Sequence, residues 1–273
     1  MEAATHRIAT PAPATTSSAD RTAPPADERA LPQLGLRGII AVWAAAAVPM
    51  GLLAWVIAPL LADQLSGPGA LVRALVITLT AGLVWQFVLV MTLVRREQGS
   101  LRWPVVRDAL WLRGPRAPRT GRRGGKLWLL VLPLSVAIAV EGLLAIPGPT
   151  AREFFEFLGS DAGEDLLAGS WGWFAIIIAL VVFNTALGEE FLFRGYLLPR
   201  MNGRFGRRDW VANGVLFAGY HLHMPWAIPS TLLDTFILSY PSKRYRSTLI
   251  SIAVHSAQSI LVLGLVLALV LKG

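Results

Sequence analysis

The stretch WGWFAIIIALVVFNTALGEEFLFRGYLLPR, residues 171–200, decides the fold class of this chain. Its first part, Trp171–Gly188, carries no charge and has the length of about 18 residues that marks a helix able to cross a membrane. Two adjacent carboxylates follow, Glu189 and Glu190, and then Arg194. Charged groups at membrane depth are costly, so they usually line a cavity, a pathway or a reactive site.

The rest of the chain repeats the apolar pattern. Of its 273 residues, 54% are hydrophobic and 15% are charged, whereas roughly 25% are charged in a soluble domain. The other long apolar runs are Gly38–Ala62, Ala74–Val94, Leu127–Pro147, which contains one acid, Trp210–Leu233 and Ser247–Leu271. We therefore predict an all-α, polytopic transmembrane bundle of seven or eight helices.

The distribution of charge predicts the orientation. The net charge is +8, and residues 95–126, between two predicted spans, hold ten Lys and Arg residues against two acids. A basic loop between spans is typical of the cytoplasmic side, and it argues against nucleic-acid binding. We expect an integral, multi-pass protein of the plasma membrane with a cytoplasmic N-terminus. The chain has no cysteine, which excludes disulfides, thiol catalysis and thiolate metal sites.

Four regions follow from this pattern. They are a disordered cytoplasmic tail (1–35), N-terminal transmembrane helices (36–147) with the basic cytoplasmic loop (95–126), an external loop with an interfacial helix (148–170), and a catalytic transmembrane region (171–272). Pro225 and Pro229 are expected to break the fifth span from a shorter sixth segment.

The charges after Gly188 divide into a pair and a single carboxylate. Glu190 and Arg194 are four residues apart, so on a helix they share a face in the acid-before-base order that favours pairing. Glu189 is rotated by about 100° and has no basic partner on the helix. It requires water, another helix or a proton. The alternative is a helix end at the headgroups, where all three groups are solvated.

Histidines lie on two other apolar segments. His221 and His223 lie in VLFAGYHLHM, and His255 lies in LISIAVHSAQSI. Two residues apart on a helix, His221 and His223 are expected to face different sides and share no ligand. Ser259 follows His255 by four residues, on the same face. The alternative for each histidine is a hydrogen-bonded packing contact between helices.

Depth favours one shared site. At about 1.5 Å per residue from the nearest basic residue on the cytoplasmic side, Glu189, His255 and His221 lie at roughly 16, 14 and 20 Å. One cavity explains these similar depths. Glu141 lies about 22 Å from that side, nearer the outer surface, and we interpret it as structural or interfacial.

These residue types suit hydrolysis of a peptide bond. An unpaired glutamate beside a histidine can hold a water and take its proton as general base. A second histidine, with a hydroxyl on its face, can donate hydrogen bonds to an oxyanion. Glu189, His221 and His255 could also ligate zinc and leave one position open, so the sequence assigns no cofactor and leaves zinc as an alternative.

Three motifs then occur in order. EEFLFR fits E-E-x(3)-R, FAGYH fits F-x(3)-H, and HSAQS is similar to H-x(3)-N/D, with Ser259 in the last position. In this order on apolar helices, residues 171–265 resemble the CPBP family of intramembrane proteases. That family includes the type II CAAX prenyl proteases and the Abi-like bacterial proteins associated with bacteriocin self-immunity.

The resemblance implies a role for each motif residue. Glu189 would be the catalytic acid and base, with His221 as its water-holding partner, and His255 would stabilise the oxyanion. Glu190 and Arg194 would brace the site, and Phe217 would pack against it. Ser259 stands where the family usually has Asn or Asp, and its shorter side chain offers a single donor.

We therefore predict an intramembrane endopeptidase whose partners are membrane lipid and a peptide or lipidated, CAAX-like protein substrate. The first alternative is a non-catalytic immunity or regulatory membrane protein that binds a partner through the same pocket. The second is a proton-coupled transporter, which would also bury carboxylates and histidines. Such transporters are commonly built from two related halves, and the sequence contains no such duplication.

Overall fold

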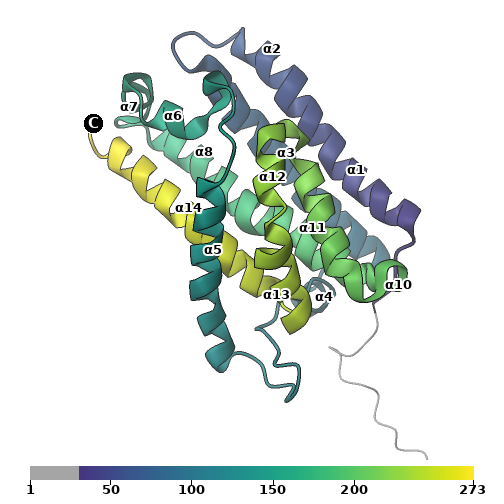
Figure 1. Ribbon diagram of the computed structural model, residues 1–273. Coiled ribbons are helices and arrows are strands. Elements are labelled where there is room, and N and C mark those ends of the chain that lie inside the picture. The colour runs from purple at the N-terminus through teal and green to yellow at the C-terminus, as the bar shows by residue number, and fades with distance from the viewer. Residues whose placement is uncertain (1–30) are drawn as a thin grey trace, which may run out of the picture. The chain divides into compact units, whose positions relative to one another are not determined.

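The computed structural model describes residues 31–273, which form helices, turns and no β-strand (Figure 1). The predicted all-α class is therefore confirmed for this part of the chain. Residues 1–30 of the predicted tail lie outside the described residues. The end of that tail contacts the bundle: the Gln33 amide donates to the Pro199 carbonyl at 3.1 Å, and the Leu34 N–H donates to the Arg200 carbonyl at 2.9 Å.

Five helices in the described residues are long and apolar enough to cross a membrane. They are α1–η2–α2 (Leu36–Leu52, Leu53–Ile57 and Ala58–Ala62), α3 (Ala70–Gln98), η3–α5 (Gly125–Leu130 and Val131–Leu143), a composite helix (Trp171–Arg200) and α14 (Thr248–Val270). The chain is a multi-pass membrane protein. The prediction of seven or eight spanning helices was wrong, and the difference arises in residues 209–245.

Residues 209–245 fold into a helical hairpin instead of two spans. Its elements are α11 (Asp209–Tyr220), η8 (His221–His223), η9 (Pro225–Ala227), α12 (Ile228–Thr231), η10 (Thr235–Ser239) and α13 (Tyr240–Tyr245). Pro225 lacks an N–H, and the preceding Met224 leaves helical geometry, so no element here is long enough to span. Asp209 pairs with Lys243 at the base of the hairpin, which therefore begins and ends at one end of the bundle.

The helix ends beside basic residues meet at that same end. Arg200 Nε lies 2.7 Å from Glu97 Oε2, which joins the composite helix to α3. The Arg116 N–H donates to the Tyr245 carbonyl at 2.7 Å, which joins the basic segment to the hairpin. The short elements at this end are α4 (Trp103–Ala109), α10 (Asn202–Phe205) and η7 (Gly206–Arg208). The basic helix ends therefore gather at one end of the bundle.

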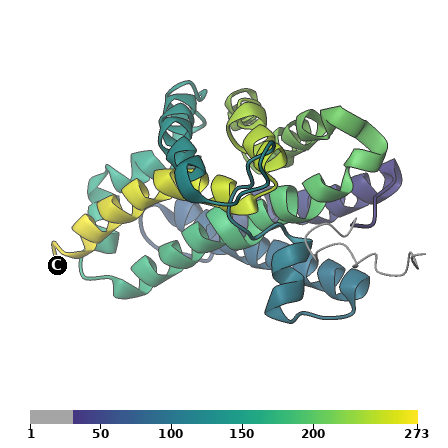
Figure 2. The ribbon, with the colours of Figure 1, turned by 90° about the horizontal axis from the view of Figure 1, so that it is seen from below.

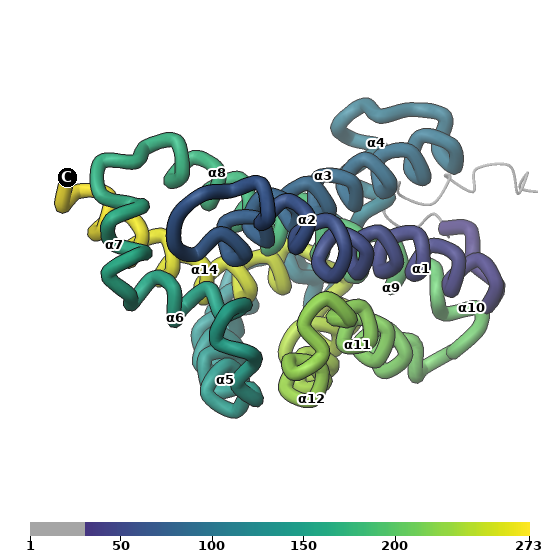
Figure 3. Tube along the Cα trace, turned by 90° about the horizontal axis from the view of Figure 1, so that it is seen from above, coloured from purple at the N-terminus to yellow at the C-terminus, as the bar shows by residue number. Residues whose placement is uncertain are grey.

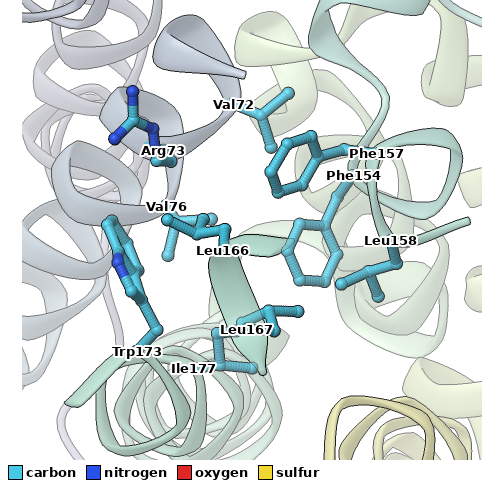
Figure 4. A pocket seen from close by; sticks show the side chains of 10 residues that line it. All are labelled: Val72, Arg73, Val76, Phe154, Phe157, Leu158, Leu166, Leu167, Trp173 and Ile177. Atoms are coloured by element: carbon cyan, nitrogen blue, oxygen red, sulfur yellow. The ribbon is translucent and has the colours of Figure 1, made fainter. Parts of the chain in front are cut away.

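The opposite end carries the segment predicted to be external. Instead of one interfacial helix it forms η4 (Thr150–Arg152), α6 (Phe154–Leu158) and α7 (Asp161–Leu167). Phe154, Leu158 and Leu167 pack with Val76 and Ile177 of the long helices (Figure 4). The Gly169 N–H donates to the Val270 carbonyl at 2.9 Å, so the end of α14 lies beside this segment (Figure 1).

Helix α5 and the hairpin lie on the same face of the bundle. Figures 2 and 3 show them next to each other, beside the long helices α3 and α14. The hairpin holds together by close approach at Gly214, where a Cβ would lie 2.7 Å from Thr235 Cα. The Ser239 hydroxyl donates to Asn213 Oδ1 at 3.0 Å across the same contact.

We expect the variant Gly214→Ala to separate the two arms of the hairpin, because the added methyl has no space. Overpacking of this kind lowers the free energy of unfolding by about 1–3 kcal/mol. Thermal unfolding of the detergent-solubilised protein measures the change. Gly264→Ala is the matched control, since a Cβ at Gly264 meets nothing within 4 Å. Equal melting temperatures for the two variants would contradict the tight crossing.

Candidate active site

Glu189 and Glu190 lie between two π-helical stretches of the composite helix. This helix consists of α8 (Trp171–Val182), η5 (Phe183–Gly188), η6 (Phe191–Leu197) and α9 (Leu198–Arg200). A π-helical turn holds an extra residue, and such turns are frequent at functional sites. At Gly188 the helix approaches α3 closely. A Cβ at this position would lie 3.1 Å from the Leu83 carbonyl oxygen, so a larger residue would be crowded.

The predicted Glu190–Arg194 pair is present and completely buried. Arg194 Nη1 lies 3.1 Å from Glu190 Oε1, and both side chains are 0% exposed. The Arg194 guanidinium also lies over the Phe217 ring, 3.9 Å from its centre, so Phe217 packs against the pair. His255 Nδ1 lies 3.2 Å from the same Glu190 oxygen. This contact joins α14 to the composite helix at the pair.

A cavity of about 580 Å³ lies next to this pair, between α3, α5, the composite helix, the hairpin and α14. Its polar wall consists of Glu141, Arg152, Glu153, Asn184, Glu189, Tyr220, His221, His223, Ser230, Thr231, Asp234, His255, Gln258 and Ser259. Four candidate residues, Glu189, His221, His255 and Ser259, thus share one cavity. Glu190 and Arg194 lie outside its wall.

Of the two adjacent carboxylates, Glu189 is the one that lines the cavity. It is 3% exposed and makes no ion pair within the described residues. Tyr220 lies close enough to interact with it, and Gln86 Nε2 is 2.6 Å from the Tyr220 hydroxyl. Neither residue is among those predicted from the sequence, although a glutamine within the apolar run of α3 is a usable signal.

His221 and His223 do not separate as expected. They lie in a 3₁₀ turn, η8, and their rings stack at 5.3 Å with 27° between the planes. The expectation that they face different sides assumed an α-helix and was wrong. A 3₁₀ helix has three residues per turn, so residues two apart are separated by about 120° around its axis, less than in an α-helix. His221 Nδ1 lies 2.9 Å from the Phe217 carbonyl oxygen, which fixes the orientation of the ring.

Two acidic residues of the wall were missed or misassigned. Asp234 follows the apolar run that ends at Leu233 and was not considered. Glu141 was interpreted as structural or interfacial from its depth alone, but it lines the same cavity from α5. The depth rule failed because the cavity extends from Glu189 toward the outer segment, where Arg152 and Phe155 also line it.

The described residues do not fit a zinc site. No group of three or more His, Cys, Asp or Glu side chains in residues 31–273 is arranged to hold a metal ion. We therefore derive no step through a metal.

Comparison with protein families matches residues 171–270 to the family described as Type II CAAX prenyl endopeptidase Rce1-like. This part of the chain is an Rce1-like domain. Comparisons with curated proteins and with solved structures gave no match. All motif residues lie within the Rce1-like domain, whereas Gln86 and Glu141 come from helices α3 and α5, before it. The cavity of the Rce1-like domain is thus completed by the N-terminal helices.

Removal of Arg194 from the Rce1-like domain should be strongly destabilising. Arg194→Met leaves Glu190 buried without its guanidinium partner, and breaking a buried pair in this way costs about 3–5 kcal/mol. The double variant Glu190→Gln with Arg194→Met should recover part of the loss. Thermal unfolding in detergent measures both. The control is Lys272→Met, which breaks a half-exposed pair with Glu164 and should change stability by less than about 1 kcal/mol.

Proposed function

We propose that the Rce1-like domain is an intramembrane endopeptidase that hydrolyses a peptide bond of a membrane-associated polypeptide. The family match supports peptidase chemistry, and one observation supports the site. Glu189 lacks an ion-pair partner within the described residues and lines a cavity with His221, His255 and Ser259. A carboxylate placed in this way can accept a proton from a water beside it.

His221 has the geometry to orient that water. Because the Phe217 carbonyl can only accept, Nδ1 of the neutral ring carries the proton and donates to it. The lone pair of Nε2 then remains for a hydrogen bond from water. Glu189 takes one water proton as the oxygen attacks the carbonyl carbon. It then gives that proton to the leaving nitrogen as the C–N bond breaks.

His255 and Ser259 supply the groups for the oxyanion. His255 Nδ1 donates to the Glu190 carboxylate. In the imidazolium form of the ring, Nε2–H remains as a second donor. Such a donor stabilises the negative charge that develops in the tetrahedral intermediate. Ser259 lines the cavity from the next turn of α14 and contributes one hydroxyl.

The apolar wall of the cavity favours an apolar or lipidated substrate. Met50, Leu79 and Val262 line it together with the polar residues. A CAAX-like, lipidated polypeptide would place its lipid against such a surface, and the peptide would reach Glu189. The basic helix ends at one side of the bundle support a cytoplasmic N-terminus, and we propose the plasma membrane as the location.

Glu189→Gln and His221→Ala should each abolish cleavage, because one removes the base and the other removes the group that holds the water. Loss of general acid–base catalysis should lower kcat/KM by roughly 10²–10⁴-fold. Cleavage of a quenched fluorescent peptide by the protein in nanodiscs measures this. Glu164→Gln, outside the cavity wall, is the matched charge control. Full turnover by Glu189→Gln would refute the mechanism.

A non-catalytic membrane protein that captures a partner through the same cavity is the second candidate. The shorter side chain at Ser259 favours it, since the donor to the oxyanion is weaker than in the family pattern. Partner capture or immunity that is unchanged in Glu189→Gln would support this candidate. If Glu189→Gln loses partner capture or immunity together with cleavage, the peptidase is supported.

A further inference from the structure

Asp234 is a buried carboxylate that the proposed mechanism does not use. It lies in the turn between α12 and η10, is 6% exposed, and lines the cavity. Its Oδ1 is buried and has no hydrogen-bond partner within the described residues. An unpaired buried carboxylate is costly, and native proteins usually retain one for a ligand or a function.

The charged groups of the cavity wall are unequal in number. Four carboxylates line the cavity, those of Glu141, Glu153, Glu189 and Asp234, whereas Arg152 is the one guanidinium of the wall. Arg152 donates to the Ala54 carbonyl at 3.2 Å and lies over the Trp55 ring. It is held against α1–η2–α2 by these contacts. Even with His255 counted as a cation, the described wall holds more carboxyl groups than cationic groups.

The cations that act electrostatically on Asp234 are also engaged elsewhere. Arg194 and His255 act on Asp234 at longer range, but both are bonded to Glu190, and Arg194 lies outside the cavity wall. Glu153 accepts a hydrogen bond from the Gly148 N–H at 2.8 Å. Glu189 has Tyr220 as a side-chain partner. Of the four carboxylates, this leaves Glu141 and Asp234 without a hydrogen bond or ion pair within the described residues.

We propose that Asp234, together with Glu141, forms a subsite that binds the cationic side chain of a lysine or arginine in the peptide substrate. The proposal rests on the proposed peptidase function, in which Glu189 acts on the peptide bond. Glu141 lies close enough to Asp234 to interact with it electrostatically, from α5 across the cavity. A cation placed between the two would be attracted by both.

The chemistry of the wall selects an amphipathic cation. Ile138 of α5 and Ala227 before α12 line the same cavity, so the alkyl part of a lysine has apolar surface to cover. Its ammonium would complete a charge-assisted hydrogen bond to Asp234, which a neutral side chain of similar length cannot form. The excess of carboxylates rejects an acidic side chain at this position by like-charge repulsion.

Binding tests the subsite without requiring cleavage. The full chain in nanodiscs of neutral lipid is titrated with apolar fluorescent peptides in which one position, moved along the peptide, carries lysine, norleucine or glutamate. The best lysine peptide should bind about tenfold more tightly than its norleucine twin, the gain of one charge-assisted hydrogen bond, and the glutamate peptide more weakly than both.

Variants assign the preference to Asp234. Asp234→Asn should remove the preference for lysine and leave binding of the norleucine peptide unchanged. Asp234→Glu, which keeps the charge, should retain most of it. Glu164→Gln removes an equal charge outside the cavity wall and should leave both affinities unchanged. Thermal unfolding of each variant verifies the fold.

The outcomes separate this subsite from the peptidase function. Equal affinity of unmodified protein for every lysine and norleucine pair, absence of binding, or a lysine preference retained in Asp234→Asn overturns the subsite. Cleavage of the peptides without a preference for lysine overturns it as well and leaves the peptidase standing. Selective binding of lysine that is lost in Asp234→Asn, without cleavage of any peptide, supports the subsite and refutes the peptidase.

Discussion

The ion pair between Glu190 and Arg194 holds the site together. Both side chains are fully buried, and two further elements attach to them: His255 of α14 bonds to the carboxylate, and Phe217 of α11 lies under the guanidinium. Segments distant in the chain therefore take their positions from one pair of charges. A buried ion pair contributes little net stability, but separating its two charges is costly. Arrangements of these helices that separate Glu190 from Arg194 are therefore disfavoured.

The same pair explains why Glu189 can remain without an ion-pair partner. The adjacent Glu190 binds the Arg194 guanidinium and one nitrogen of His255. Because these cationic groups are bound to Glu190, Glu189 lines the cavity without an ion-pair partner. Gln86 of α3 contributes by holding the Tyr220 hydroxyl, which interacts with Glu189. Although the Rce1-like match begins at residue 171, the N-terminal helices form part of the cavity wall.

Much of the site could be predicted because few polar residues lie in the apolar segments. Charged groups are costly at membrane depth, so those that occur there usually have a function. The pairing of Glu190 with Arg194 followed from helical spacing, and the depths of Glu189, His221 and His255 indicated one cavity. The hairpin was not predictable from hydropathy, since its apolar residues pack inside a membrane protein and are as hydrophobic as those of a span. Glu141 was misjudged and Asp234 was missed. A depth counted in residues from the cytoplasmic side does not show how far a cavity extends toward the other side.

The hairpin also accounts for the irregular backbone at the site. Away from water, backbone N–H and C=O groups need partners, so breaks in a helix are tolerated only where protein or a wet cavity surrounds them. Residues 221–234 contain short 3₁₀ and α-helical turns, and many of them line the cavity. A continuous span at this position would place His221 and His223 on different faces. The stacking of both histidines at the cavity thus depends on the break at Pro225, and the loss of a span is the structural cost of that arrangement.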